Sequence, residues 1–296
     1  MHGLRRCEGL AAQVPACLLI MTNTLRRLQA QSRLPRLEQQ MLWQQVLGVE
    51  RIWLISHDTD PLPAEAVQRY QALEARRRQG EPMAYLLGWR EFMGHRFTVT
   101  PAVLIPRPDT ECLVEHALRV VADVPTPRIL ELGTGSGAIA VSLALARPDA
   151  QLWATDISDA ALAVAQQNAQ TLCGKVEFLR GSWYDALSAP HSGVSAHFDL
   201  IVSNPPYIAA DDTHLGQGDL RFEPRQALTD EANGLQDLRT IIQGASPWLR
   251  PGGQLWLEHG WQQAADVREL LHQAGFTAVS SQRDLAGIER LSGGTF

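Results

Sequence analysis

The sequence has no apolar stretch long enough to cross a membrane, and it contains little cysteine. No apolar run reaches the roughly 18 residues that a membrane-spanning helix needs. The four cysteines, Cys7, Cys17, Cys112 and Cys173, form no C-x-x-C pair, and no His/Cys cluster has the spacing of a zinc site. We therefore expect a protein without a membrane span or a metal centre, with free thiols in a reducing cytosol.

Positive charge is scarce relative to negative charge. The chain has 26 Lys and Arg against 32 Asp and Glu, a formal net charge of -6 and a pI of about 5.8. Binding to nucleic acid needs many cationic contacts to phosphate, so this balance argues against such a partner without excluding a local basic groove. With 296 residues, 45% of them hydrophobic, the chain is expected to form one large or two modest globular domains.

Residues 1–20 resemble a signal peptide only superficially. Two arginines precede a weakly apolar stretch, but Glu8, Gln13 and Pro15 interrupt it and no small-residue cleavage site follows. Met21 then opens an amphipathic helical pattern. We interpret residues 1–20 as a disordered extension or the product of an upstream start codon, and we expect them to be dispensable.

Residues 21–87 have the periodicity of a small helical domain, because apolar side chains recur at steps of three and four. Breaks are expected at Pro35, at Gly48 and at residues 60–63, before a last helix over 64–79. Residues 88–108 then become β-like and predict a hairpin linker, followed by a helix after Pro108.

Residues 109–296 alternate between short apolar strands and helices. This alternation predicts βαβ units, and hence an α/β fold with a mostly parallel sheet covered by helices on both faces. The expected strands are 128–132, 151–156, 176–179, 199–203 and 254–258, and the expected helices are 138–146, 158–172, 234–248 and 262–274. Two last segments, 277–283 and 289–291, are expected to pair antiparallel at a sheet edge.

A glycine-rich loop follows the first of these strands and opens a helix. It comprises Glu131, Leu132, Gly133, Thr134, Gly135, Ser136 and Gly137. Glycine lets the backbone turn tightly and approach a ligand closely, so the loop predicts a cofactor site. The pattern also fits dinucleotide binding, and the loop alone does not choose between cofactors.

Three side chains near this loop bear on the choice of cofactor. Asp156 ends the second strand, where a carboxylate can accept hydrogen bonds from ribose hydroxyls of either cofactor. Glu131 discriminates better, because its carboxylate would repel a pyrophosphate but favours the cationic S-adenosylmethionine. Trp183, in the loop after the third strand, is placed to stack on adenine, with a core role as the alternative.

The fourth strand ends in Asn204, Pro205, Pro206 and Tyr207. The two prolines stiffen the loop and cannot donate hydrogen bonds, so its carbonyls are available as acceptors. Asn204 adds a side-chain oxygen and Tyr207 a flat ring. Two acceptors aimed at a planar NH2 group would orient its delocalised lone pair, which predicts transfer of a methyl group to an amide or amino nitrogen.

Together these motifs resemble a known family. The segment Gly133–Gly137 with Asn204–Tyr207 resembles class I methyltransferases that act on exocyclic or amide nitrogen. Within that class, residues 104–111 (LIPRPDTE), 217–224 (QGDLRFEP) and 258–260 (EHG) resemble the peptide chain release factor N5-glutamine methyltransferases. The resemblance runs from about Met21 to the C-terminus, which favours Met21 as the native start.

The resemblance implies a substrate, a fold and a set of contacts. The substrate would be the glutamine of the Gly-Gly-Gln motif in class 1 release factors, and the product N5-methylglutamine. The implied fold is a helical N-terminal domain, a β-hairpin linker and a Rossmann-like catalytic domain. The implied contacts to S-adenosylmethionine are Gly133–Gly137, Asp156, Trp183 and Asn204, and those to glutamine are Asn204–Tyr207.

The helical domain is expected to dock the release factor, because one glutamine is too small to identify a protein. The chain's own Gly252-Gly253-Gln254 follows Pro251 and reads as a tight turn rather than a substrate.

Four alternatives remain open on the sequence alone. The first is a sister enzyme acting on a ribosomal-protein glutamine, against which only residues 106–111 argue. The second is a DNA amino-methyltransferase, which would need base flipping and a basic target-reading region. The others are a dinucleotide-dependent oxidoreductase, which leaves residues 204–207 unexplained, and a non-enzymatic module with a vestigial cofactor site.

Overall fold

The computed structural model describes residues 23–188 and 197–296, so the predicted extension at 1–20 lies outside the described residues. The chain forms two compact units, one ending at Glu74 and the other running from Ala75 to Phe296. The domain boundaries that we placed at residues 87 and 108 stay predictions. None of the helices in the described part is both long and apolar enough to span a membrane.

The first unit is helical, as its periodicity predicts. Its helices are α1 (Leu25–Gln31), α2 (Arg36–Leu47), α3 (Arg51–Ser56) and most of α4 (Ala64–Arg78). The Thr24 side chain caps α1 by accepting a hydrogen bond from the Arg27 amide, and Gly48, with a φ of 66°, ends α2. Trp43 and Tyr70 are fully buried and stack with ring centroids 4.1 Å apart, so they form the centre of this small core.

A short helix, α5 (Met83–Leu87), precedes the expected hairpin. The hairpin consists of β1 (Trp89–Phe92) and β2 (His95–Thr98), which pair antiparallel across a two-residue turn. Both turn residues, Met93 and Gly94, have positive φ, as the type I′ turn of a two-residue hairpin requires. Asn168 fixes the hairpin by bonding the N–H and the carbonyl of Thr98.

The second unit contains a seven-stranded sheet in the order β5-β4-β3-β6-β7-β9-β8. The strands β3 to β7 pair in parallel, whereas β9 pairs antiparallel with β7 and β8. Their bounds are β3 Arg128–Leu132, β4 Gln151–Asp156, β5 Glu177–Arg180, β6 Phe198–Ser203, β7 Leu249–Glu258, β8 Thr277–Arg283 and β9 Glu289–Thr295. The predicted α/β fold and antiparallel edge pair are therefore confirmed.

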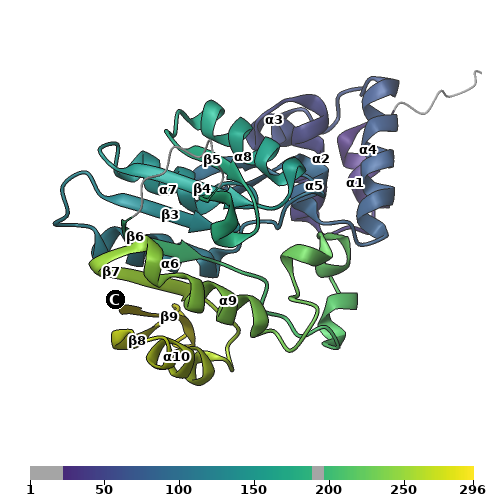
Figure 1. Cartoon of the computed structure of the whole chain (residues 1–296). Helices are drawn as coiled ribbons and strands as arrows, with labels where there is room; N and C mark the ends of the chain where they lie inside the picture. Colours follow the sequence, from purple (N-terminus) through teal and green to yellow (C-terminus); the bar gives the residue numbers. More distant parts are fainter. Residues whose placement is uncertain (1–22, 189–196) are drawn as a thin grey trace, which may run out of the picture. The chain divides into compact units, whose positions relative to one another are not determined.

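Helices cover both faces of this sheet (Figure 1). On one face, α6 (Pro108–Val120), α7 (Ala138–Ala146) and α8 (Asp159–Leu172) pack against strand residues such as Ile129, Leu200 and Val202. On the other face, α9 (Gln236–Gly244) and α10 (Ala264–Gln273) pack against strand residues such as Leu130 and Ile201. Side chains along each strand alternate between two cores, which is why these strands read as continuous apolar runs.

Three predicted elements need correction. The helix expected over 234–248 ends at Gly244, and a 3₁₀ turn follows over Ser246–Trp248, because Pro247 cannot donate the next helical hydrogen bond. Residues 103–105 belong to no strand, although we expected β structure there. The tight turn expected at Gly252-Gly253-Gln254 is an irregularity inside β7, which begins at Leu249 and shifts its register against β6.

The close pairing of β7 with β9 generates a stability prediction. A Cβ atom at Gly293 would lie 2.3 Å from both the Leu255 carbonyl oxygen and the Trp256 ring. Gly293→Ala should therefore destabilise the protein by about 1–3 kcal/mol, the usual cost of overpacking. Gly216→Ala is the matched control, because a Cβ there meets nothing within 4 Å. Urea unfolding of both variants checks this, and equal midpoints would contradict the close packing.

Candidate active site

The candidate site is a pocket of about 310 Å³ at the carboxyl ends of β3, β4 and β6. The chain crosses from β3 to β4 on one side and places β6 on the other, so this is the point where the strand order reverses. The structure brings most of the predicted residues into the pocket wall: Glu131, Gly133, Thr134, Gly135, Ser136, Asp156, Trp183, Asn204 and Pro206. Gly137, Pro205 and Tyr207 stand outside that lining.

The glycine loop turns directly from β3 into α7. Gly133, Gly135 and Gly137 have φ values of 71°, 54° and 80°, a backbone conformation that residues with a Cβ atom rarely adopt. At Gly137 a Cβ would also lie 3.1 Å from that of Ala165, so this glycine lets α7 and α8 approach each other. Gly137 therefore serves helix packing, while the backbone of Gly133 and Gly135 faces the pocket.

Glu131 is a buried carboxyl group under the glycine loop, with 1% of its surface exposed. One oxygen, Oε2, accepts hydrogen bonds from the Thr134 hydroxyl at 2.6 Å and from the Ala140 amide at 2.9 Å. Burial nevertheless dominates and raises the pKa of Glu131 to about 8. A nearby cation in the pocket would favour the ionised form of this group.

Asp156 is held by backbone amides at the end of β4. Its Oδ2 accepts from the Gly135 amide at 2.8 Å and its Oδ1 from the Ser158 amide at 2.9 Å. Each carboxylate oxygen has a further lone pair, so both can still accept a hydrogen bond from a ligand hydroxyl. Burial raises the pKa of Asp156 despite these amide contacts.

Trp183 closes the pocket over the glycine loop. It has a φ of 47°, and its ring leaves only 3.2 Å for a Cβ at Gly133. The indole hydrogen-bonds to Asp237, at the start of α9, which also lines the pocket. The ring thus faces both the pocket and the loop, as the stacking hypothesis requires, although stacking itself stays a prediction.

Asn204 reaches the pocket from the carboxyl end of β6. Its Nδ2 donates to the Thr110 hydroxyl on α6 at 3.1 Å, and both side chains line the pocket. Pro206 lines the pocket beside Asn204, whereas Pro205 is buried behind it. The side chain that we predicted to hold a planar NH2 group therefore lies in the same pocket as the glycine loop.

Tyr207 is anchored behind the pocket by two side chains. Its hydroxyl donates to Glu258 Oε1 at 3.2 Å, and its backbone carbonyl accepts from Gln263 Nε2 at 3.1 Å. This backbone carbonyl thus has a partner within the chain, and the ring packs into the core that contains α9 and α10. These contacts hold Tyr207 and its loop in place, and the predicted contact of Tyr207 with the glutamine stays a prediction.

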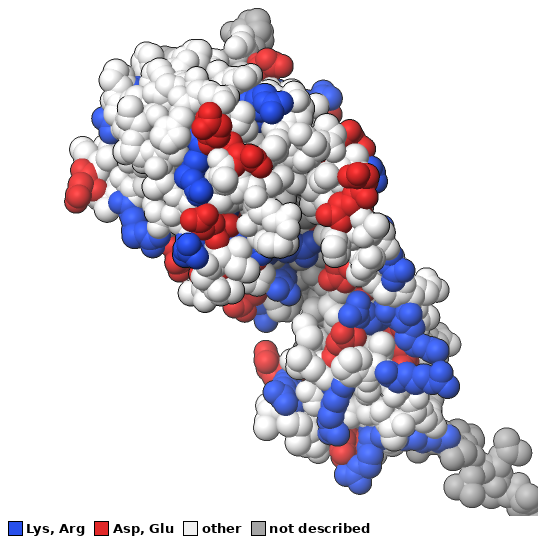
Figure 2. Space-filling model, turned by 90° about the horizontal axis from the view of Figure 1, so that it is seen from below, with Lys and Arg blue, Asp and Glu red and all other residues white. Residues whose placement is uncertain are grey.

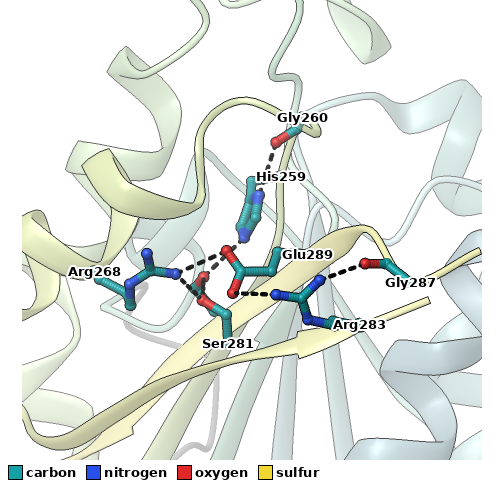
Figure 3. A network of polar contacts seen from close by, with 8 residues as sticks. His259, Gly260, Arg268, Ser281, Arg283, Gly287 and Glu289 are labelled. Carbon is teal, nitrogen blue, oxygen red and sulfur yellow. Dashed lines mark hydrogen bonds and ion pairs between the residues drawn. The ribbon is translucent and has the colours of Figure 1, made fainter.

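A network of polar contacts joins His259 and Gly260 to α10, β8 and β9 (Figure 3). His259 is buried, and its Nδ1 lies 2.9 Å from the Gly260 carbonyl, which only accepts, so the hydrogen must be on Nδ1. Its Nε2 then accepts from the Ser292 hydroxyl at 2.8 Å. Burial lowers the pKa of His259, which keeps the ring neutral in this role.

The network reaches Tyr207 through Gly260. The Gly260 amide donates to Gln263 Oε1 at 2.8 Å, and Gln263 Nε2 donates to the Tyr207 carbonyl. On the far side, Ser292 contacts Ser281, which accepts from Arg268. The segment 258–260 therefore works as a support for the turn at 204–207.

The structure also adds residues that the sequence reasoning did not assign to the site. Arg107 and Ile157 line the pocket, and Arg107 pairs with the buried carboxylate of Glu223. Glu223 Oε1 also accepts from the Ile105 amide at 3.0 Å, so it joins the segments 104–111 and 217–224. Ile157 could have been found from the sequence, because it directly follows Asp156 at the carboxyl edge.

A doubly wound sheet with this strand order, a glycine loop after β3 and an acid after β4 defines the class I methyltransferase fold. The hMettl16 catalytic domain in complex with the MAT2A 3′UTR hairpin 1 has the same fold, with a TM-score of 0.52 and 14% identity over 78% of this chain and 80% of that chain. Family models match the chain as the PrmC N-terminal domain over residues 20–88 and the methyltransferase small domain over residues 109–220.

Close relatives decide the family. The release factor glutamine methyltransferase of Bordetella pertussis is 59% identical over 91% of this chain and 98% of its own length. That of Burkholderia pseudomallei is 54% identical over 89% of this chain and 93% of its own length. The chain belongs to the release factor glutamine methyltransferase family.

The buried carboxyl of Glu131 generates a prediction on pH and stability. The native state binds its proton more tightly than the unfolded state, because its pKa is about 8 instead of 4.5. Its contribution to stability is therefore present at low pH and lost as pH rises toward 8, by up to about 1.4 kcal/mol per pH unit. Glu131→Gln should remove this loss and flatten the dependence of unfolding free energy on pH.

Urea unfolding between pH 5 and 9 measures the effect. Glu115→Gln, which removes an exposed carboxyl group, is the matched control. A Glu131→Gln profile parallel to the wild-type profile would show that Glu131 does not bind an extra proton in the native state.

Proposed function

We propose that this chain transfers a methyl group from S-adenosylmethionine to the side-chain amide nitrogen of the glutamine in the Gly-Gly-Gln motif of class 1 release factors. The observation that carries the proposal is the position of Asn204, whose side chain shares one pocket with the glycine loop and Asp156. The relatives named for this activity match the chain over nearly its whole length, which supports the same substrate. We expect the reaction to take place in the cytosol, where translation ends.

The pocket fits S-adenosylmethionine by the chemistry of its donors and acceptors. Asp156 keeps lone pairs for the ribose hydroxyls, and Trp183 offers a flat face for adenine. The raised pKa of Glu131 favours its protonated form, and a cationic ligand in the pocket would shift it toward the ionised form. When bound, this cofactor supplies an electrophilic methyl group. The backbone of the glycine loop would hold it, and Asn204 would contact both the cofactor and the substrate amide.

The chain's own contribution to the reaction is orientation. An amide nitrogen is a poor nucleophile because its lone pair is delocalised into the carbonyl group. Asn204 Oδ1, with the carbonyls of the proline turn, would accept the two hydrogens of the glutamine NH2 group and fix the direction of its lone pair. No side chain has to remove a proton first, because the nitrogen becomes more acidic as it gains the methyl group and then releases its proton to water.

A protein substrate also fits the distribution of charge better than a nucleic acid does. In the upper part of Figure 2, Asp and Glu side chains lie among the Lys and Arg side chains, whereas Lys and Arg side chains predominate in the lower part. A surface of mixed charge, as in the upper part, gives no continuous attraction to phosphate. We propose that residues 21–87 dock the release factor, since its recognition needs a surface wider than one glutamine.

The direct test incubates the protein with labelled S-adenosylmethionine and, separately, with a release factor, a ribosomal protein and DNA. We expect label on the release factor alone, located by mass spectrometry on the glutamine of the Gly-Gly-Gln motif. A release factor whose motif glutamine is replaced by asparagine is the control and should stay unlabelled. Label on the ribosomal protein or on DNA, with none on the release factor, would overturn the proposal.

Removing the Asn204 side chain should slow the chemical step. By analogy with the loss of one preorganised hydrogen-bonding group, we expect Asn204→Ala to reduce turnover by about a hundredfold or more. Folding should survive, because Asn204 is half-buried at a strand end and leaves no large cavity. Single-turnover methylation with both substrates saturating measures the loss, and Asn23→Ala, at an exposed asparagine, is the control. An Asn204→Ala enzyme that binds both substrates and keeps its rate would remove Asn204 from the mechanism.

A further inference from the structure

The side chain of Thr110 contacts the proposed substrate-binding asparagine from behind. It lies in the first turn of α6, is 5% exposed and lines the pocket. Its hydroxyl accepts a hydrogen bond from Asn204 Nδ2 at 3.1 Å. The amide of Asn204 is thereby turned so that Nδ2 points to α6, which leaves Oδ1 at the opposite end of the amide plane.

The direction of this hydrogen bond matters for the chemistry. An asparagine amide has a donor end and an acceptor end of nearly the same shape, so only its partners select the orientation. With Oδ1 toward the substrate, Asn204 can accept from a glutamine NH2 group. With the amide reversed, Asn204 would present its own NH2 to the substrate NH2, and two donors would face each other.

A hydroxyl group can hold an amide in either orientation, unless its single hydrogen is used elsewhere. Glu258 lies where it can provide that second partner. A hydrogen bond from the Thr110 hydroxyl would lower the pKa of Glu258, because it favours the charged carboxylate. Glu258 is 2% exposed, and its Oε2 meets no hydrogen-bond partner of standard geometry among the described residues, so it is open to the Thr110 hydrogen.

Glu258 is held in turn by the proposed glutamine-binding loop. Its other oxygen, Oε1, accepts the hydroxyl hydrogen of Tyr207 at 3.2 Å. An ionised carboxylate only accepts, so it draws the hydrogens of both Thr110 and Tyr207 toward itself. The oxygen of Thr110 is then left as an acceptor, which is the role that Asn204 Nδ2 requires.

We propose that Thr110 is a positioning residue for methyl transfer, which holds the Asn204 amide with its oxygen toward the substrate, while ionised Glu258 fixes the Thr110 hydroxyl as an acceptor. This proposal rests on the proposed function, since it concerns how the same site receives an amide nitrogen. Thr110 acts through Asn204 and does not touch the reacting atoms.

The arrangement makes turnover depend on pH. Burial raises the pKa of Glu258 to about 7, against the opposing effect of the Thr110 and Tyr207 hydroxyls. The charged and titratable groups facing it are Asp109 and Cys112 on α6 and Arg290 on β9. Arg290 is also ion-paired with Asp109, at 3.4 Å.

The direction in which turnover changes with pH follows from where the Thr110 hydroxyl hydrogen points. Above about pH 7, Glu258 is ionised and the Asn204 orientation is fixed. Below it, a protonated Glu258 can donate to Thr110, whose own hydrogen is then free to turn toward Asn204 and reverse the amide. Turnover at saturating cofactor should therefore fall as the pH drops through about 7. Saturating cofactor separates this from Glu131, whose protonation acts on cofactor binding.

The test compares Thr110→Val, which keeps the shape and loses the hydroxyl, with Thr110→Ser, which keeps the hydroxyl. Single-turnover methylation of the release factor at saturating cofactor should slow by about tenfold to a hundredfold in Thr110→Val, the scale of a small misplacement of reacting groups. Cofactor affinity and the Michaelis constant for the release factor should stay near wild type. Thr110→Ser should restore most of the rate. Glu258→Gln should be slow at every pH and lose the fall through pH 7.

A second readout does not depend on activity. The side-chain amide signals of Asn204, assigned by their loss in Asn204→Ala, should shift in the NMR spectrum of Thr110→Val and return in Thr110→Ser. If Thr110→Val does not fold, Glu258→Gln and the wild-type pH profile decide the proposal by themselves.

The outcomes separate this proposal from the proposed function. Thr110→Val with unchanged turnover and pH profile would overturn the positioning role, and so would Thr110→Ser as slow as Thr110→Val. A wild-type protein that leaves the release factor unmethylated would overturn the proposed function. The NMR signals would in that case still test whether Thr110 holds the Asn204 amide.

Discussion

The parallel pairing of β3 with β4 on one side and β6 on the other is the constraint on which the site depends. Because the three strands are in register, their carboxyl ends bring the glycine loop, Asp156 and Asn204 to one edge of the sheet. These residues are far apart in the sequence, and no local propensity would bring them together. The two apolar cores that hold the strands therefore also set the distance between the proposed cofactor and substrate groups.

Three buried carboxyl groups beneath the pocket loops lower the stability of the fold near neutral pH. Glu131, Glu223 and Glu258 are each less than a tenth exposed, and burial raises the pKa of each. A buried charge without partners is strongly unfavourable, and each of these groups has hydrogen-bond donors from a loop that forms the pocket. The carboxyl groups thus hold loops that have no regular secondary structure of their own, at the expense of stability near neutral pH.

Much of the fold and the site could be predicted from local patterns. The alternation of apolar runs indicated the order of strands and helices, and the positions of Glu131, Asp156 and Asn204 near strand ends predicted that they share one pocket. Pro247 shows why helix ends are hard to predict from the sequence. The apolar periodicity of residues 234–248 continues past the last hydrogen bond of the helix. The roles of Thr110, Gln263 and His259 depend on contacts across 94, 56 and 33 positions of sequence, which no local pattern contains.

The chain's own Gly252-Gly253-Gln254 shows why a sequence motif alone cannot define the substrate. The Gly252 amide bonds the Phe296 carbonyl, and the Phe296 amide bonds the Gly253 carbonyl. Gln254 is paired with β6 and β9, and its side-chain oxygen accepts from the Trp256 indole at 2.8 Å. To enter the pocket, this glutamine would have to leave a central strand and break those bonds. We therefore expect a substrate glutamine to stand on a free loop, and we expect the surface that presents the loop to contribute to recognition together with the three residues of the motif.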